Sequence, residues 1–249
     1  MDIKNIQKKL EKIVLSYGKL ALDSQESNSI IRYSPNICTD IDVKIEQQFS
    51  EWVSHNFPDY SLIMEESSDL KDSRYTWVLD AIDGSKYYIK GVPLWTVTAA
   101  LLEDGQPIIG VVYQPQSKML FSASKNNGAF LNGKKIICQH NLQDSENEQI
   151  SVDLTFGSKN YKQYAGYVST LLDELHQKFY RVRSFGCGSL SLCWLSVGMF
   201  SAYMAPLLKP EKYIDIAAGL LIATESGLRV QKKPNKQFPE VTTILVDLR

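Results

Sequence analysis

The chain contains 249 residues, of which 44% are hydrophobic, 22% charged and 10% aromatic. This composition is typical of a globular protein with a sizeable core; it excludes a wholly disordered chain, and 14 Gly and 9 Pro exclude a collagen-like one. Because 27 Lys and Arg residues are balanced by 28 Asp and Glu residues, there is no basic surplus for binding nucleic acid or an anionic membrane.

The N-terminal residues and the cysteines indicate a cytoplasmic protein. The first residues alternate Lys, Glu and aliphatic side chains, which is unlike a signal peptide. No run reaches the roughly 18 apolar residues of a membrane-spanning helix. The cysteines form no CxxC pair, so we expect reduced, buried thiols. They are Cys38, Cys138, Cys187 and Cys193.

Two helices are predicted at the start of the chain. Apolar residues recur at intervals of three or four positions from Ile3 to Tyr17, which indicates an amphipathic helix. A second helix is expected after Thr39 and Asp40, either of which is a suitable N-cap. Pro58 ends it.

From Tyr60 to Ile137, short β-branched and aromatic runs alternate with turn residues. This pattern predicts an antiparallel meander of strands. The expected strands are Ser61 to Met64, Thr76 to Leu79, Leu94 to Leu102, Ile108 to Tyr113, Met119 to Ala123 and Ala129 to Leu131.

A polar stretch at residues 139–149 is the best boundary between two subdomains, 1–138 and 150–249. The second subdomain alternates helices and strands, so the chain is predicted to be an α+β protein. Its expected strands are Ile150 to Leu154, Ser201 to Met204 and Val241 to Val246, and its expected helices are Tyr161 to Phe179, Leu190 to Met199 and Tyr213 to Ser226.

The segment most informative about chemistry begins at Trp77, where an apolar run leads into Asp80, Asp83, Gly84 and Ser85. Acids at the end of a buried strand need cations. A Gly-Ser turn offers backbone N–H groups and a hydroxyl to an anion such as phosphate. A metal next to a phosphate indicates phosphoryl transfer to water.

Further acids stand at the ends of other apolar segments, as the pair Glu65-Glu66 and as Asp215. Carboxylates without thiols or imidazoles favour a hard cation, most commonly Mg2+. Each motif alone also has a structural explanation: a turn, a solvent-facing pair, or a helix start favoured by the dipole. Only the combination points to a site.

The segment from Trp77 to Gly133 resembles the inositol monophosphatase family of magnesium-dependent, lithium-sensitive phosphatases. The family motif Trp-x-x-Asp-Pro-Ile-Asp-Gly-Thr is matched here with Ala81 and Ser85 in place of Pro and Thr. The resemblance extends, in the family's order, over nearly the whole chain. The other matching residues are Thr39 and Asp42, Glu65 and Glu66, and Asp215, Ala217, Ala218 and Gly219.

The resemblance implies a layered αβαβα sandwich of the inositol monophosphatase/fructose bisphosphatase type, usually a homodimer. It also implies two Mg2+ ions. Glu65, Asp80 and the Ile82 carbonyl would hold the first ion, and Asp80, Asp83 and Asp215 the second.

For the reaction, the resemblance implies that Gly84 and Ser85 bind the phosphate. Asp42 and the Ser85 hydroxyl would orient or deprotonate the attacking water, with Glu65 completing the catalytic set. The loop of Gly186, Cys187 and Gly188 would face the substrate.

These residues predict a Mg2+-dependent phosphomonoesterase for a small polyol or sugar monophosphate. Two other substrates stay open: Lys86 is similar to the bisphosphate-nucleotide phosphatase branch, and Gly91 to Trp95 is similar to the histidinol-phosphate branch. The Glu that contacts inositol in the family, about seven residues before Asp215, is missing. A different class, an inactive phosphate- or Mg2+-binding regulatory module, is disfavoured because all the ligand carboxylates are present.

Overall fold

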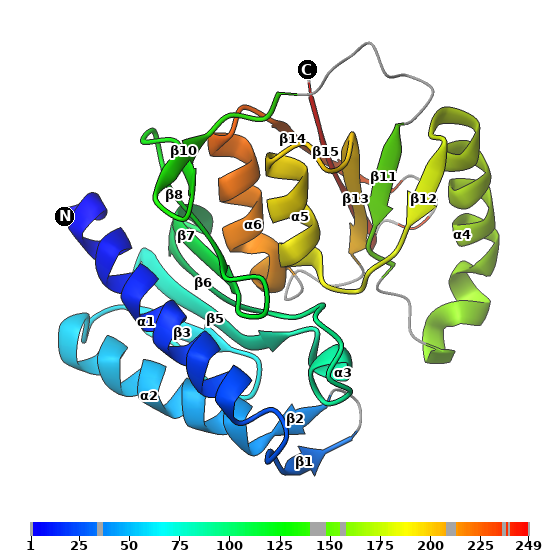
Figure 1. Ribbon diagram of the computed structural model, residues 1–249. Coiled ribbons are helices and arrows are strands. Elements are labelled where there is room, and N and C mark those ends of the chain that lie inside the picture. The colour runs from blue at the N-terminus through cyan, green and yellow to red at the C-terminus, as the bar shows by residue number, and fades with distance from the viewer. Residues whose placement is uncertain are drawn as a thin grey trace.

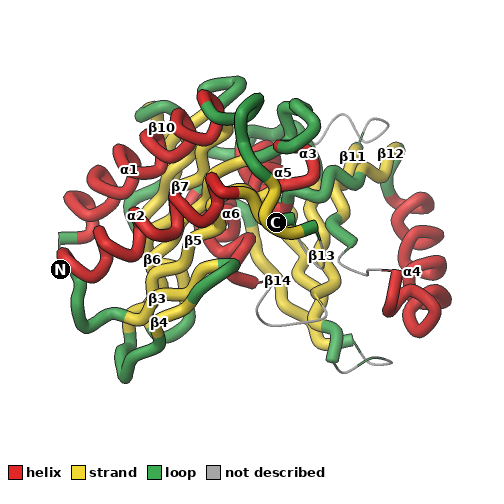
Figure 2. Tube along the Cα trace, turned by 90° about the horizontal axis from the view of Figure 1, so that it is seen from below, coloured by secondary structure: helices red, strands yellow, loops and turns green. Residues whose placement is uncertain are grey.

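The computed structural model describes residues 2–33, 37–139, 148–154, 158–207, 213–235, 238 and 240–248. They form five layers, with helices outside and between two sheets (Figures 1 and 2). Helices α1 (Ile3–Asp23) and α2 (Asp40–Asn56) cover one face of an eight-stranded sheet. Helices α5 (Gly188–Ser196) and α6 (Tyr213–Glu225) lie between this sheet and a five-stranded one, and α4 (Ser158–Lys178) packs beside the second sheet. The expected αβαβα sandwich is confirmed.

The first sheet has the strand order β10-β9-β8-β7-β6-β5-β3-β4, and the second has the order β12-β11-β13-β15-β14. Strands β1 and β2 form a separate pair, and α3 (Ser85–Tyr88) is a single helical turn. The strand bounds are β1 (Ile30–Arg32), β2 (Cys38–Thr39), β3 (Ser61–Met64), β4 (Ser68–Asp69), β5 (Tyr75–Asp83), β6 (Thr96–Glu103), β7 (Gln106–Gln114), β8 (Met119–Ser124), β9 (Ala129–Leu131), β10 (Lys134–Ile136), β11 (Gln149–Val152), β12 (Arg181–Arg183), β13 (Ala202–Leu207), β14 (Arg229–Pro234) and β15 (Thr242–Asp247).

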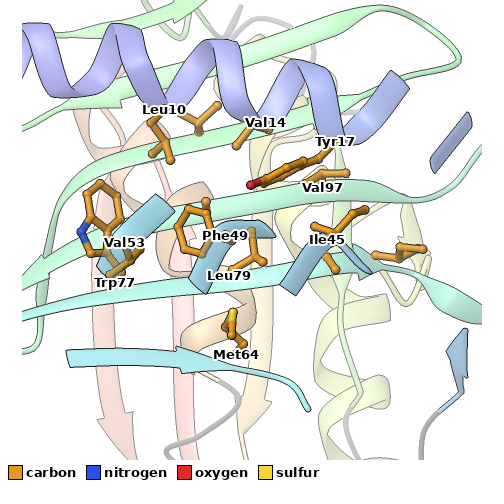
Figure 3. Packing of buried hydrophobic residues seen from close by; sticks show 14 of the residues in the cluster. Leu10, Val14, Tyr17, Ile45, Phe49, Val53, Met64, Trp77, Leu79 and Val97 are labelled. Carbon is orange, nitrogen blue, oxygen red and sulfur yellow. The ribbon is translucent and has the colours of Figure 1, made fainter. Parts of the chain in front are cut away.

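The two N-terminal helices form as the apolar periodicity predicts. Their buried stripes meet over the first sheet, where Phe49 of α2 contacts the ring of Trp77 edge-on at 5.9 Å between centroids (Figure 3). Thr39 caps α2 in a capping box with Asp42, which confirms Thr39 as the N-cap.

The predicted meander is correct from β5 to β9 and wrong for β3, and the short strands β4 and β10 were not predicted. Strand β3 runs parallel to β5, with Ser61 beside Thr76 and Met64 beside Leu79. The physical reason is β4, which reverses the chain at the outer edge of β3, so that the next strand runs in the direction of β3 again. The carboxyl ends of β3 and β5 therefore lie at the same edge of the sheet.

In the second subdomain the expected helices and strands are present, although α4 begins at Ser158 instead of Tyr161 and α5 spans Gly188–Ser196 instead of Leu190 to Met199. Strands β12 and β14 were not predicted, because both are edge strands with mainly charged, solvent-facing residues. Of the expected boundary at 139–149, residues 140–147 lie outside the described part of the chain. Across the described ranges, every helix is too short or too polar to cross a membrane.

Helix α6 rests directly on strand β7. A Cβ atom at Gly110 of β7 would lie 2.9 Å from the Cα and carbonyl oxygen of Ala218, so only glycine permits this approach. Since Asp215 is in the first turn of α6, this contact also determines how close that carboxylate comes to the first sheet.

We predict that Gly110→Ala lowers the free energy of unfolding by about 1–3 kcal/mol, because the backbone of α6 has to move. The matched control is Gly166→Ala on the exposed side of α4, where a Cβ would meet nothing within 4 Å. It should raise stability by about 0.5–1 kcal/mol through helix propensity. Urea unfolding of both variants tests the contact, and equal effects would contradict it.

Candidate active site

A bulge at the end of β5 brings Asp80 and Asp83 together. Asp80 pairs with Thr98 and Asp83 with Thr96, so three steps along β5 oppose two steps along β6. In a regular strand, residues three apart point to opposite faces of the sheet. The extra residue removes this alternation, and Asp83 is the charge with the largest effect on Asp80.

The parallel register places Glu65 beside the same two acids. The register ends with Met64 opposite Leu79, so Glu65 and Asp80 follow at the same edge of the sheet, and the charge of Glu65 is among those that raise the pKa of Asp80. Asp42, in the first turn of α2, and Asp215, in the first turn of α6, reach the cluster from either side of the sheet. The structure thus brings together the five carboxylates that the sequence singled out.

The electrostatics of this cluster are unfavourable without a cation. Asp80 is 7% exposed. Its pKa is raised well above the ordinary value, first by burial and then by the negative charges of Asp83, Glu65, Asp215 and Asp42. In the part of the chain that the structure describes, no Lys or Arg side chain forms an ion pair with Asp80.

The side chains of this cluster suit a hard divalent cation, because they offer carboxylate oxygens and because their negative charges repel one another around the buried Asp80. Within the described ranges, no three His, Cys, Asp or Glu side chains are already arranged as a metal centre. Metal ligation by Glu65, Asp80, Asp83, Asp215 and the carbonyl of Ile82 therefore stays a prediction.

The N–H and hydroxyl of Thr39 both hold Asp42, at 2.8 and 2.6 Å from its Oδ2 atom. Burial raises the pKa of Asp42, while the bonds from Thr39 oppose this shift. The Ser85 hydroxyl donates to the Ile82 carbonyl at 2.9 Å, so its oxygen is left to accept a hydrogen bond from another group.

Gly84 enables the turn between β5 and α3. Its φ is +97°, and a Cβ there would lie 2.5 Å from the carbonyl oxygen of Leu94. Any other residue would strain the backbone and displace this segment. The sequence reasoning assigned Gly84 to phosphate binding, and the structure shows that the residue is also needed for the turn itself.

Glu46 is a supporting residue that the sequence analysis missed. Its buried carboxylate accepts the N–H of Glu66 and the hydroxyl of Ser67, both at 2.9 Å. Arg32 holds the Glu66 carboxylate with both terminal nitrogens. These contacts fix the segment that carries Glu65. The available signal was spacing, since residue 46 follows Asp42 by one helical turn.

Ser189, at the start of α5, connects the two subdomains at Asp83. Its hydroxyl and N–H donate to Asp83 Oδ2 at 2.5 and 3.2 Å, and its oxygen lies 2.7 Å from the Thr96 hydroxyl. Thr96 was not predicted as a site residue, and Ser189 was predicted only as part of the substrate-facing loop, because this contact joins residues about a hundred positions apart.

The predicted substrate loop, residues 186–189, lies against the same acid. The Cys187 thiol donates to Asp83 Oδ2 at 3.2 Å. Burial, followed by the charge of Asp83, raises the pKa of Cys187 well above its usual value. The thiol is therefore protonated, and its role here is to pack and donate a hydrogen bond.

Comparisons with known proteins agree with this architecture. A sequence model described as the inositol monophosphatase family matches residues 2–246. A fructose-1,6-bisphosphatase/inositol-1-monophosphatase of Aquifex aeolicus is 32% identical over 192 residues, which cover 75% of this chain and 69% of the relative. A Nus factor SuhB of Pasteurella multocida is 32% identical over 193 residues, covering 76% of this chain and 69% of that protein.

Among solved structures, the extragenic suppressor protein suhB from Bartonella henselae has the same fold. Its TM-score is 0.83 at 22% identity, and the match covers 98% of this chain and 94% of that one.

We predict that Asp80→Asn stabilises the metal-free protein at neutral pH. Because the folded-state pKa of Asp80 is raised, ionising this group destabilises the fold as the pH rises through that pKa, and Asn removes the charge. Each 1 kcal/mol that the lost repulsion adds to the free energy of unfolding should raise Tm by about 2–4 °C. Thermal melts in chelator and in MgCl2 test this expectation.

Added Mg2+ should raise Tm of the wild type and have less effect on Asp80→Asn. The matched control is Asp72→Asn, an exposed acid outside the cluster, which should melt and respond to Mg2+ like the wild type. An unchanged or lower Tm for metal-free Asp80→Asn would contradict the repulsion described above.

Proposed function

We propose that this chain, which belongs to the inositol monophosphatase family, is a Mg2+-dependent phosphomonoesterase acting on a small phosphorylated metabolite. The observation that carries the proposal is the convergence of Asp42, Glu65, Asp83 and Asp215 on the buried Asp80. Such a cluster is costly unless a divalent cation binds it. It also lies next to the turn at Gly84, where an anion can approach backbone N–H groups.

The metal ligands proposed are Glu65, Asp80 and the Ile82 carbonyl for one ion, and Asp80, Asp83 and Asp215 for a second. Bound there, Mg2+ would polarise the phosphate and make the water more acidic. Glu46 and Arg32 keep the segment of Glu65 in place, and Ser189 holds one oxygen of Asp83.

The attacking water is proposed to bind between the Ser85 oxygen and the carboxylates of Asp42 and Glu65. Ser85 already donates its proton to the Ile82 carbonyl, so it acts as an acceptor that orients the water. Asp42 or Glu65 would accept one proton of this water while its oxygen forms a bond to phosphorus. The N–H groups of Gly84 and Ser85 would bind phosphate oxygens while the bond between phosphorus and the ester oxygen breaks. The proton taken up by the carboxylate would then pass through water to the leaving alkoxide, so alcohol and phosphate are released without a covalent phosphoenzyme, because water itself is the nucleophile.

A phosphorylated polyol or sugar, with inositol monophosphate as the default, is the substrate class we propose. The Aquifex aeolicus relative carries both inositol-1-monophosphatase and fructose-1,6-bisphosphatase in its name. Histidinol phosphate and a 3'(2'),5'-bisphosphate nucleotide are the alternatives within the class. We further propose that the protein is a cytoplasmic homodimer.

A second candidate function is favoured by the relative named Nus factor SuhB. In that case the carboxylate cluster would bind metal, or the turn at Gly84 would bind phosphate, in a regulatory module without turnover. The two functions differ in one measurable property, which is whether phosphate is released.

We predict chelator-sensitive phosphate release from at least one of four compounds: inositol monophosphate, histidinol phosphate, a bisphosphate nucleotide and fructose bisphosphate. Each is assayed with Mg2+ and with chelator. The compound that is hydrolysed identifies the substrate branch. If none is hydrolysed while Mg2+ still raises Tm, the regulatory module replaces the enzyme as the proposed function.

Asp83→Asn should reduce kcat by at least about a hundredfold with little change in fold, because the side chain keeps its shape and loses its charge. Ser189→Ala provides a graded comparison, since Asp83 remains but loses a short hydrogen bond. We expect it to require more Mg2+ for half-maximal activity. Full activity of Asp83→Asn would rule out Asp83 as a metal ligand.

A further inference from the structure

Two polar side chains meet over the glycine at the start of α5. A Cβ atom on Gly188 would lie 2.7 Å from Asp153 Oδ2 and 2.9 Å from the Tyr203 hydroxyl. The loop therefore has glycine where these two groups occupy the space of a side chain. Neither group belongs to the metal-ligand set described above.

Asp153 and Tyr203 come from adjacent parallel strands. Asp153 follows the end of β11, and its N–H donates to the Met204 carbonyl of β13 at 2.8 Å. Tyr203 is the preceding residue of β13, and Ser151 is its partner in the β11 register. The backbone of the second sheet thus fixes both groups, while the Asp153 side chain remains partly exposed.

The Tyr203 hydroxyl is the feature that calls for a ligand. Tyr203 is 0% exposed, and its hydroxyl has no hydrogen-bond partner among the described residues. A buried hydroxyl without a partner is destabilising. Burial and the charges of Asp153 and Asp83 raise its pKa well above the usual value, so the phenol stays neutral and can donate as well as accept.

The pair also lies at the correct side of the site for the alcohol half of a substrate. The proposed phosphate-binding residues, Gly84 and Ser85, belong to the first subdomain. Asp153 and Tyr203 belong to the second, across Gly188, and Tyr203 is within electrostatic range of Asp83 and Asp215. Gly188 follows Cys187, whose thiol donates to Asp83 Oδ2 at 3.2 Å, so the pair lies beside the loop that borders the carboxylate cluster.

We propose that Asp153 and Tyr203 bind a hydrogen-bond-donating group, a hydroxyl or an ammonium, on the alcohol half of the substrate. A hydroxyl would donate to Asp153 and accept from Tyr203, whereas an ammonium would donate to both and balance the carboxylate. A second phosphate would be repelled. This inference rests on the proposed phosphatase function and specifies its substrate class.

The test compares Asp153→Ala, Asp153→Asn and Tyr203→Phe with the wild type. The substrates are inositol monophosphate, which offers hydroxyls, histidinol phosphate, which offers an ammonium, and p-nitrophenyl phosphate, whose leaving group has no donor. The readout is kcat/KM for each donor-bearing substrate divided by kcat/KM for p-nitrophenyl phosphate. Asp173→Ala, an exposed acid of α4, is the control.

Asp153→Ala should lower this ratio about tenfold or more, as expected for a lost hydrogen bond to a charged group. Tyr203→Phe should lower it less. If the ligand group is an ammonium, Asp153→Asn should resemble Asp153→Ala. If it is a hydroxyl, Asn should retain much of the ratio, because its oxygen still accepts a hydrogen bond. The control should keep the wild-type ratio.

If Asp153→Ala and Tyr203→Phe are active and their ratios are unchanged, the inference is overturned, whereas the proposed phosphatase function is not. An equal loss on all substrates would also overturn it, because that result indicates a structural role. Since Tyr203→Phe removes one buried oxygen without a partner, it should fold and keep the test valid if Asp153 variants do not. No release from any compound by the wild type would overturn the proposed function, and the inference with it.

Discussion

Repulsion among the carboxylates around Asp80 is the constraint on which the rest of this structure depends. A buried acid is stable when a cation or hydrogen-bond donors compensate its charge. Here the charges with the largest effect on Asp80 are other carboxylates. The surrounding fold must therefore hold apart, and in place, groups that would otherwise separate or become protonated. This arrangement destabilises the metal-free protein and favours the binding of a divalent cation. The same repulsion therefore affects both the stability and the proposed function.

Three backbone features impose that arrangement. The bulge in β5 places Asp80 and Asp83 together, and the parallel register of β3 and β5 brings Glu65 to the same edge. The contact of α6 with Gly110 brings Asp215 close from the opposite face. The register and the α6 contact are made by backbone atoms, whereas within the bulge the Ile82 N–H also donates to Asp80 Oδ1 at 3.0 Å. Hydrophobic cores on both faces of the first sheet supply the free energy that maintains the cluster.

Much of the fold followed from local patterns, because apolar periodicity determined α1, α2 and most strands of the first sheet. The site acids were found because they stand at the ends of apolar runs and match a family motif. The parallel direction of β3 was missed, since strand direction depends on the short edge strand β4, whose residues are exposed and carry no apolar pattern. The roles of Glu46 and Tyr203, and the contact of Ser189 with Asp83, were missed for a related reason: the groups involved are distant in sequence, so spacing alone gives little indication of them.

The charge around the site also bears on which substrate fits. Lys86 is exposed on α3, where it can meet an anion, and this favours a second phosphate. Asp153 has the opposite effect, and it lies across Gly188 in the second subdomain, whereas Lys86 belongs to the first. A further phosphate near Asp153 would meet this carboxylate, which is outside the proposed metal-ligand set, and would be repelled at short range. A neutral or cationic alcohol avoids this repulsion, so the proposed pair of Asp153 and Tyr203 would select a polyol or amino-alcohol monophosphate over a bisphosphate.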